Sequence, residues 1–408
     1  MKIDQQHDAF IATNRQEYGR DYEFLAFPTA GQAMAAHAER DGLLAWLKQH
    51  AEFGCRETKV DCRRLSPGCR SCADGGWSCL FINGRCNASC FYCPASQDET
   101  DGPQSNGIPF TTPEDYAEYV ALFGFTGVSI SGGEPLLTLD RTLAYLAAVR
   151  RRCGDAVHLW MYTNGTLLTR EIVGRLHDAG LDEIRFDIGA TNYDLTRLRL
   201  AVGVIPTVTV EIPAVPEEEV LMRAKLVEMA AAGVRHLNLH QMRLTPHNFR
   251  HLAGRDYTFM HGEKVTVLES ELTALRLVRY SLEQGIDLPV NYCSYPYKRR
   301  FQHAAARRRG VRFIMSGDES ITEAGYVRAV GDGSVRYFEA VTLPAGSDRQ
   351  SFMEIPLPSG NRIVIEKRPV CTAIPAASSL FDDMPPDALL PAELRRFEQI
   401  SAGLADYY

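Results

Sequence analysis

Between residues 77 and 240, six short apolar segments alternate with segments of helical period, and this alternation restricts the fold more than any other feature. The apolar segments cover residues 78–82, 127–131, 156–163, 181–189, 205–213 and 234–240. Helical periodicity and boundary residues predict helices at 111–124, 138–153, 169–180, 192–203 and 217–233. Strands that are apolar throughout are typical of parallel sheets buried on both faces. The sequence therefore predicts an α/β fold, a barrel or a doubly wound sheet, with active residues at the carboxyl ends of the strands.

The segments on either side of this alternation differ from it. Residues 1–54 have helical spacing, and residues 55–78 are rich in cysteine and in turn residues and are expected to be loop-like. An irregular insertion, a long helix and the apolar segment 288–293 follow residue 240, and short strand-like segments begin at 311. We predict four parts: a helical extension at 1–54, a cysteine-rich segment at 55–78, an α/β unit at 79–310, and a β-rich region with a terminal helix at 311–408.

Charge and hydropathy exclude several classes of protein. The 408 residues carry a formal charge of -7, which argues against a general nucleic-acid-binding surface. No apolar run approaches about 20 residues, and the polar N-terminus lacks the apolar core of a signal peptide. We therefore expect a cytoplasmic protein without a membrane span. Thiols stay reduced there, so its 11 cysteines favour metal ligation over disulfides.

Three of these cysteines lie within eight residues, in the segment RCNASCFYCP at 85–94. Cys86, Cys90 and Cys93 directly follow the first apolar strand, so they would lie at its carboxyl end. A cuboidal iron–sulfur cluster takes one thiolate for each of four irons, and three thiolates leave one iron open to a further ligand. The alternative is a zinc knuckle that lacks one partner.

Two further motifs make the interpretation of this cysteine segment more specific. ISGGEPLL at 130–137 ends the second strand, and YTNG at 162–165 ends the third. Together the three motifs resemble the radical S-adenosylmethionine (SAM) superfamily. The resemblance implies a partial barrel of six strand–helix units, a [4Fe–4S] cluster and SAM. It also implies reductive cleavage of SAM to methionine and a 5′-deoxyadenosyl radical, which abstracts a hydrogen atom from the substrate.

The resemblance also implies roles for individual residues. Cys86, Cys90 and Cys93 correspond to the cluster ligands. The SAM-binding positions would be Tyr92 near the adenine, the amino-group site Gly132, Gly133, Glu134 and Pro135, the turn residues Thr163 and Asn164, and the strand-end residues Asp187 and Glu211. His240 and Gln241, which end the sixth strand, could face SAM or the substrate. Other interpretations stay open for three of these residues. Asp187 could form an ion pair with Arg185 or cap a loop, Glu211 could be structural, and His240 could be a core histidine.

Five other cysteines predict a second metal site. Cys69 and Cys72 form a Cys-x2-Cys pair, which ligates zinc or iron–sulfur clusters equally well. With Cys55 and Cys62 upstream and Cys293 downstream, they would hold an auxiliary iron–sulfur cluster. The absence of a metal is the second choice and structural zinc the third, and Cys371 is an alternative closing ligand. We expect Cys79 and Cys153 to be ordinary packed or free thiols.

The stretch from about 65 to 310 also resembles a branch related to pyruvate formate-lyase activating enzyme. The segments that carry this resemblance include residues 68–94, 180–187, 210–216, 236–242 and 291–309. It implies an alternative function, the installation of a radical on a glycine of a partner protein. Otherwise we expect a small-molecule or peptide substrate and an electron donor of the flavodoxin or ferredoxin type.

Two alternatives remain. The basic segment 298–309 could receive a phosphate, RNA or an acidic electron donor, or it could be a solvated helix face. The chain as a whole could instead be a non-enzymatic iron–sulfur or zinc protein that senses redox state or binds RNA.

Overall fold

A curved parallel sheet lies at the centre of the computed structural model, which describes residues 2–96, 98–99, 102–331, 334–344, 352–375 and 392–407. Its strands are β3 (Trp77–Phe81), β8 (Gly127–Ser131), β9 (His158–Thr163), β10 (Glu183–Phe186), β11 (Thr207–Pro213), β12 (His236–His240) and β15 (Val290–Cys293). The spatial order is β15-β12-β11-β10-β9-β8-β3, and every neighbouring pair is parallel. All six predicted strands are present, and residues 288–293 add a seventh.

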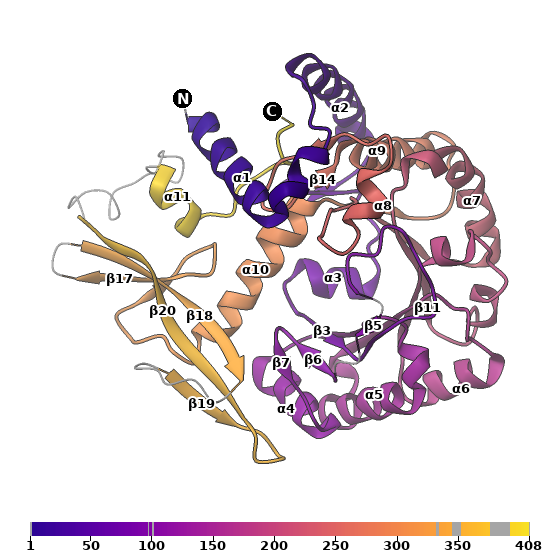
Figure 1. Ribbon diagram of the computed structural model, residues 1–408. Helices are drawn as coiled ribbons and strands as arrows, with labels where there is room; N and C mark the ends of the chain where they lie inside the picture. Colours follow the sequence, from indigo (N-terminus) through magenta and orange to yellow (C-terminus); the bar gives the residue numbers. More distant parts are fainter. Residues whose placement is uncertain are drawn as a thin grey trace.

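The sheet does not close into a full barrel, because each end pairs with a short antiparallel hairpin. At one end β15 pairs with β2 (Lys59–Val60), which pairs with β1 (Phe53–Gly54). At the other end β3 pairs with β6 (Gln104–Ser105), which pairs with β7 (Ile108–Pro109). The fold is thus the predicted α/β partial barrel, built on a curved sheet (Figure 1).

Helices cover the outer face of the sheet (Figure 1). They are α4 (Pro113–Phe123), α5 (Leu139–Cys153), α6 (Arg170–Asp178), α7 (Glu219–Ala232) and α9 (Leu268–Glu283). Their ends follow the sequence signals. Thr112 caps α4 ahead of Pro113, and Gly124 ends that helix at φ 63°, a conformation that glycine adopts without steric cost.

Three local predictions were wrong. Residues 192–203 form turns and a short 3-10 helix, Leu198–Leu200, because Asp194 accepts hydrogen bonds from the backbone and hydroxyl of Thr196 and so competes with helix formation. Residues 55–78 are not only loop: they contain β2 and the helix α3 (Pro67–Ala73), which Ser66 caps. Residues 311–316 form no strand, since α10 (Tyr295–Val311) runs to Val311 and turns follow it.

Helix α3 lies inside the curve of the sheet (Figure 1), where an ionic network holds it. The Arg185 guanidinium is almost fully buried and donates to Glu183, Glu211 and the Ser66 hydroxyl, at 2.8, 2.6 and 3.1 Å. Glu183 also accepts a bond from the Gly68 backbone N–H at 3.1 Å. A Cβ on Gly68 would lie 2.3 Å from the Arg185 guanidinium, so a larger residue there would displace that guanidinium from its partners. The cysteine-rich segment is therefore fixed to the barrel by buried charges.

The ends of the chain pack around this core. Helix α1 (Lys2–Tyr18) and the 3-10 helix Gly19–Phe24 lie against the insertion that contains α8 (Phe249–Ala253), β13 (Phe259–Met260) and β14 (Thr266–Val267). Helix α2 (Ala30–His50), with a capping box at Thr29, packs on α9 through the buried Arg40–Glu271 pair. Among the described residues, we find no helix with the length and apolar character needed to cross a membrane.

The C-terminal region is an antiparallel sheet that lies against α10. Its order is β16 (Ser320–Ile321), β17 (Val327–Gly331), β18 (Ser334–Pro344), β20 (Arg362–Pro375) and β19 (Phe352–Pro356), and α11 (Ala392–Glu398) follows. Residues 376–391, which precede α11, lie outside the described residues. The division of the chain into four domains stays a prediction.

Candidate active site

The three clustered thiols follow β4 (Gly84–Arg85), in a loop beyond the carboxyl end of β3. Cys86, Cys90 and Cys93 are half-buried and form no disulfide. A tight turn joins two of them, in which the Cys93 N–H donates to the Cys90 carbonyl at 3.0 Å. The Cys86 sulfur accepts weak hydrogen bonds from the Ala88 N–H and the Asn164 side-chain amide, at 3.4 and 3.8 Å. Burial raises the pKa of Cys90 to about 12, so this thiol needs a nearby cation to be ionised at neutral pH.

The GGEP turn at the end of β8 packs directly on the start of this loop. The Gly133 N–H donates to the Asn83 carbonyl at 2.8 Å, and the Glu134 N–H donates to the Arg85 carbonyl at 2.7 Å. A Cβ on Gly132, where φ is 137°, would lie 2.2 Å from the Asn83 carbonyl oxygen, and one on Gly133 would lie 1.9 Å from the Arg85 oxygen. Both glycines are therefore required for the backbone of this turn to reach the cysteine loop.

The Glu134 side chain joins this turn to the YTNG turn at the end of β9. It is fully buried, and it accepts hydrogen bonds from the Thr163 hydroxyl at 2.8 Å and the Asn164 N–H at 2.7 Å. The Asn164 side-chain amide in turn donates to the Asn87 oxygen at 2.8 Å, within the cysteine loop. A continuous chain of contacts thus links the ends of three neighbouring strands.

Tyr92 links the cysteine loop to the end of β10. Its hydroxyl donates to Asp187 Oδ1 at 2.7 Å, and the same oxygen accepts the Gly189 N–H at 3.1 Å. Asp187 therefore caps a loop, which was one of its open interpretations, and its ion pair with Arg185 is not formed. Burial raises the pKa of Asp187 to about 6. The carboxylate holds Tyr92 in place as long as it is ionised.

Glu211 and His240 have different surroundings. Glu211 is held by Arg185 and by the Asn238 amide at 3.1 Å, in the network that anchors α3. Burial alone would raise the pKa of Glu211, but Arg185 lowers it below its ordinary value. The Nδ1 atom of His240 is buried and has no hydrogen-bond partner within the described part of the chain. Burial, with Lys298 nearby, lowers the pKa of His240 to about 3, so its imidazole is neutral at pH 7.

Comparison with known proteins identifies the family. The radical SAM superfamily matches residues 80–211. A protein of Methanocaldococcus jannaschii, named as a glycyl-radical enzyme activating enzyme, is 31% identical over 276 residues, which cover 64% of this chain and 72% of that protein. The chain belongs to the radical SAM superfamily. The predicted relation to the activating-enzyme branch is thereby confirmed.

Other similarities to this radical SAM enzyme are more limited. The GTP 3′,8-cyclase of Corynebacterium glutamicum is 33% identical over 147 residues, and this chain spans only 37% of it. SuiB of Streptococcus suis bound to SAM aligns with 11% identity over 70% of this chain and 63% of its own, at a TM-score of 0.39. The AdoMet-bound structure of anSMEcpe aligns with 14% identity over 64% of this chain and 70% of its own, at a TM-score of 0.38. At such scores neither structure adds to the assignment.

A radical SAM enzyme carries a [4Fe–4S] cluster and SAM, and the residues at the strand ends fit both groups. Three thiols in one loop supply three of the four ligands that a cubane needs, and the glycine turn brings backbone against that loop. Across the described residues, no three Cys, His, Asp or Glu side chains are grouped tightly enough to hold one ion. A cluster takes one thiolate per iron, so its ligands span more space than those of a single ion.

The five other predicted metal ligands are contributed by three elements. Cys55 and Cys62 lie in the β1–β2 hairpin, Cys69 and Cys72 in α3, and Cys293 at the end of β15. Lys59 of β2 lies beside one of them, with its Nζ atom 2.6 Å from the Cys293 sulfur. Sequence analysis missed this lysine, because a single lysine in a short hairpin strand carries no signal of its own.

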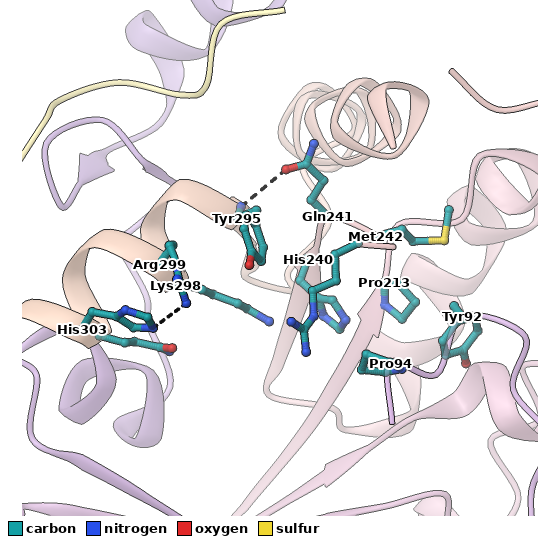
Figure 2. Close-up of a pocket in the computed structure, with 12 residues that line it drawn as sticks. Tyr92, Pro94, Pro213, His240, Gln241, Met242, Tyr295, Lys298, Arg299 and His303 are labelled. Atoms are coloured by element: carbon teal, nitrogen blue, oxygen red, sulfur yellow. Dashed lines mark hydrogen bonds between the residues drawn. The ribbon is translucent and has the colours of Figure 1, made fainter. Parts of the chain in front are cut away.

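A pocket of about 290 Å³ opens between the cysteine loop and α10. Figure 2 shows Tyr92 and Pro94 on one side, Lys298 and His303 on the other, and His240 between them. Arg243, Arg299 and Gln302 also line it, and the described residues around it include no Asp or Glu. The basic run at 298–309 partly indicated this pocket, whereas nothing in the sequence pointed to Arg243.

The rest of that basic run is structural. Arg300 donates to the carbonyls of residues 401–403, and Arg307 donates to the Ala324 carbonyl at 2.6 Å. The Arg309 guanidinium lies over the Phe125 ring, 4.6 Å from its centroid. The helix therefore presents one face to the pocket and uses another to hold the C-terminal region.

Proposed function

We propose that this radical SAM enzyme removes a hydrogen atom from an anionic small molecule or peptide bound in the pocket beside Tyr92. In this proposal Cys86, Cys90 and Cys93 ligate the cluster and the GGEP turn receives the SAM amino group. The observation that carries it is the continuous contact from Cys86 through Asn164 to Glu134. It makes the cysteine loop and the two turns one site at the ends of three parallel strands.

When bound, the reduced cluster supplies the electron that splits SAM into methionine and a 5′-deoxyadenosyl radical, which takes a hydrogen atom from the substrate. The residues of the chain orient the reactants and exclude water. Asn164 fixes the cysteine loop through Asn87, and Asp187 fixes Tyr92, which lines the pocket. Pro94 and Pro213 add apolar surface to that pocket, which limits the water near a reactive radical.

The charge of the pocket supports an anionic substrate. Arg299 is paired with Glu263, but Lys298 and Arg243 form no ion pair within the described ranges. His240, neutral at pH 7, adds an unpartnered ring nitrogen close to them. Two cations without carboxylate partners and one free ring nitrogen suit a phosphate or carboxylate group.

Two finer parts complete the proposal. An electron donor of the flavodoxin or ferredoxin type reduces the cluster, and the thiols around Lys59 hold an auxiliary iron–sulfur cluster. The second candidate function is that of an activase, and the M. jannaschii relative favours it. In that case the hydrogen atom comes from a backbone glycine of a partner protein.

Product analysis under anaerobic conditions tests the proposal. With dithionite and SAM, the reconstituted enzyme should release 5′-deoxyadenosine, and the triple variant Cys86→Ala/Cys90→Ala/Cys93→Ala should release none. Cys153→Ala is the matched control, because Cys153 lies on α5 against the Ala117 carbonyl. An intact enzyme with a full cluster that forms no 5′-deoxyadenosine would refute the radical SAM reaction.

Deuterium transfer separates the two candidate substrates. A lysate of host cells grown in heavy water is divided by ultrafiltration, and each fraction is added with SAM. Deuterium in 5′-deoxyadenosine from the filtrate alone supports a small molecule, and deuterium from the retained fraction alone supports a protein partner. Lys298→Gln and Arg243→Gln should reduce the transfer from the filtrate but keep the basal 5′-deoxyadenosine. If both variants transfer deuterium normally, the anionic pocket is wrong.

A further inference from the structure

Three separate elements bring five thiols to one place. Lys59 pairs directly with Cys293 across the β2–β15 ladder, so their side chains project from the same face of the sheet. The Lys59 Nζ atom lies 2.6 Å from the Cys293 sulfur and 4.6 Å from the centroid of the Tyr297 ring, whose hydroxyl donates to the Cys72 sulfur. Cys69 lies three residues before Cys72 on α3, the Cys62 sulfur lies 3.8 Å from the Lys59 carbonyl oxygen, and Cys55 accepts the Thr58 N–H in the turn before Lys59. We call these five cysteines the Lys59 thiol group.

Lys59 itself requires anions around it. Its side chain is 1% exposed, and no described Asp or Glu forms an ion pair with it. An uncompensated buried ammonium costs several kcal/mol, so an enclosed lysine without a carboxylate needs another source of negative charge. Its hydrogen-bond partner is the Cys293 sulfur and not a carboxylate. A metal core bound by four thiolates carries the net negative charge that this lysine lacks.

Neighbouring side chains hold these thiols in the way that side chains around metal-ligating cysteines do. The Tyr297 hydroxyl and the Gln302 amide both donate to the Cys72 sulfur, at 3.0 and 3.3 Å. The Ser294 hydroxyl donates to the Thr58 carbonyl at 2.6 Å and so anchors the hairpin turn beside Cys293. Hydrogen bonds to ligating sulfurs orient them and tune a cluster's reduction potential.

We propose that the Lys59 thiol group holds a second, closed iron–sulfur cluster. Cys69, Cys72 and Cys293 supply three ligands, and one thiol of the hairpin, Cys55 or Cys62, supplies the fourth. Lys59 is its buried counter-charge. Iron–sulfur is favoured over zinc because the same chain already carries an iron–sulfur cluster, so its thiols meet iron and sulfide during assembly.

Four protein thiolates leave no open iron, so substrate does not bind to this cluster. The site nevertheless lies close to the substrate pocket, because Gln302 contacts Cys72 and also lines that pocket. This inference deepens the proposed function and rests on it only for the choice of iron–sulfur over zinc.

Metal analysis of the variant that lacks the first cluster tests the site directly. Cys86→Ala/Cys90→Ala/Cys93→Ala is reconstituted anaerobically with ferrous iron and sulfide and should keep about four iron and four sulfide per chain. Adding Cys69→Ala/Cys72→Ala should remove them, whereas adding Cys153→Ala should not. Of Cys55→Ala and Cys62→Ala, one should keep the iron and the other lose it. Circular dichroism checks that each variant is folded.

Lys59→Met provides a readout that a purely structural role would not change. The variant should keep its iron, and the midpoint potential of the second cluster should shift to a more negative value, because a positive charge beside the cluster favours its reduction. An unchanged potential would overturn the counter-charge role.

Three results would overturn the second cluster: no iron in the folded triple variant, stoichiometric zinc without sulfide, or a disulfide within the Lys59 thiol group of the anaerobic protein. The radical reaction is judged separately by 5′-deoxyadenosine. Absence of that product with about eight iron per wild-type chain would refute the proposed radical reaction and leave this inference standing.

Discussion

Replacing Glu183 with glutamine should lower the free energy of unfolding by about 3–5 kcal/mol, the cost of breaking a buried ion pair. Glu183 is fully buried on β10 and accepts from four donors. One oxygen serves Arg185 Nε and the Thr209 hydroxyl, both at 2.8 Å, and the other serves His158 Nε2 at 3.0 Å and the Gly68 N–H at 3.1 Å. An amide can accept on only one of these two sides.

The cheaper orientation of the amide can be worked out from the structure. If its NH2 group faces Arg185, the charged Nε–H of Arg185 meets a donor, whereas the Thr209 hydroxyl can rotate and accept. If it faces His158, that ring can change tautomer and accept, and only the Gly68 N–H loses its partner, at about 1–3 kcal/mol. In both orientations Arg185 loses a charged partner and keeps only Glu211. The sum of these two effects gives the expected loss.

Denaturant unfolding of the anaerobic protein measures the effect. The matched control is Glu228→Gln, an exposed carboxylate on α7 paired with Lys225, which should change stability by less than about 0.5 kcal/mol. Because Gly68 begins the turn that carries Cys69, Glu183→Gln should also speed alkylation of Cys69 and Cys72 in the metal-free protein. Equal stabilities of the two variants would refute the claim that this network fixes α3.

The effect of Glu183→Gln on the free energy of unfolding should also depend on pH. Burial alone would raise the pKa of Glu183, but Arg185 and His158 hold it below its ordinary value of 4.5. Its contribution is therefore complete above that value and is lost as the pH falls toward the folded-state pKa. The stability difference between Glu183→Gln and the wild type should accordingly shrink in acid.

Three further predictions concern other sites. Gly133→Ala should destabilise the protein by about 1–3 kcal/mol and reduce iron loading, since its Cβ would lie 1.9 Å from the Arg85 oxygen. The control Gly174→Ala on α6, with nothing within 4 Å, should be neutral or stabilising by up to about 1 kcal/mol. If denaturant melts gave the reverse order of stability, the close packing of the GGEP turn on the cysteine loop would be contradicted. Burial lowers the pKa of His261 to about 4, so stability present above about pH 6.5 should be lost as the pH falls toward 4. Partial solvation limits that loss of stability to about 1–2 kcal/mol. His261→Phe should flatten the dependence of the free energy of unfolding on pH, and an unchanged slope in this variant would show that His261 is not its source. Asp115→Ala removes the acceptor of the Ser359 N–H and hydroxyl, at 2.9 and 2.5 Å, and should speed limited proteolysis near residue 359 relative to Glu114→Ala; equal cleavage rates would show that the contact does not hold this loop.

Much of the fold follows from local sequence, because buried parallel strands must be apolar throughout and helix ends need specific capping residues. This is why all six barrel strands, and Gly124 as the end of α4, could be predicted. The cysteine loop and its two companion turns were predictable for a related reason: their residues follow strands whose carboxyl ends meet at one edge. The helix predicted at 192–203 does not form, although the residues have helical periodicity, because the hydrogen bonds of Asp194 compete with helix formation.

What only the tertiary structure decided is which distant groups meet. The sequence could identify Cys55, Cys62, Cys69, Cys72 and Cys293 as candidate metal ligands. The buried cation beside them depends on the strand register that sets Lys59 opposite Cys293, 234 residues away. The pocket likewise combines His240 and Arg243 with a face of α10 that no local pattern assigns to them. Local sequence determines the chemistry that each strand end can offer. Burial and register, which depend on the whole chain, determine which charges must compensate one another, and therefore where a second metal site can exist.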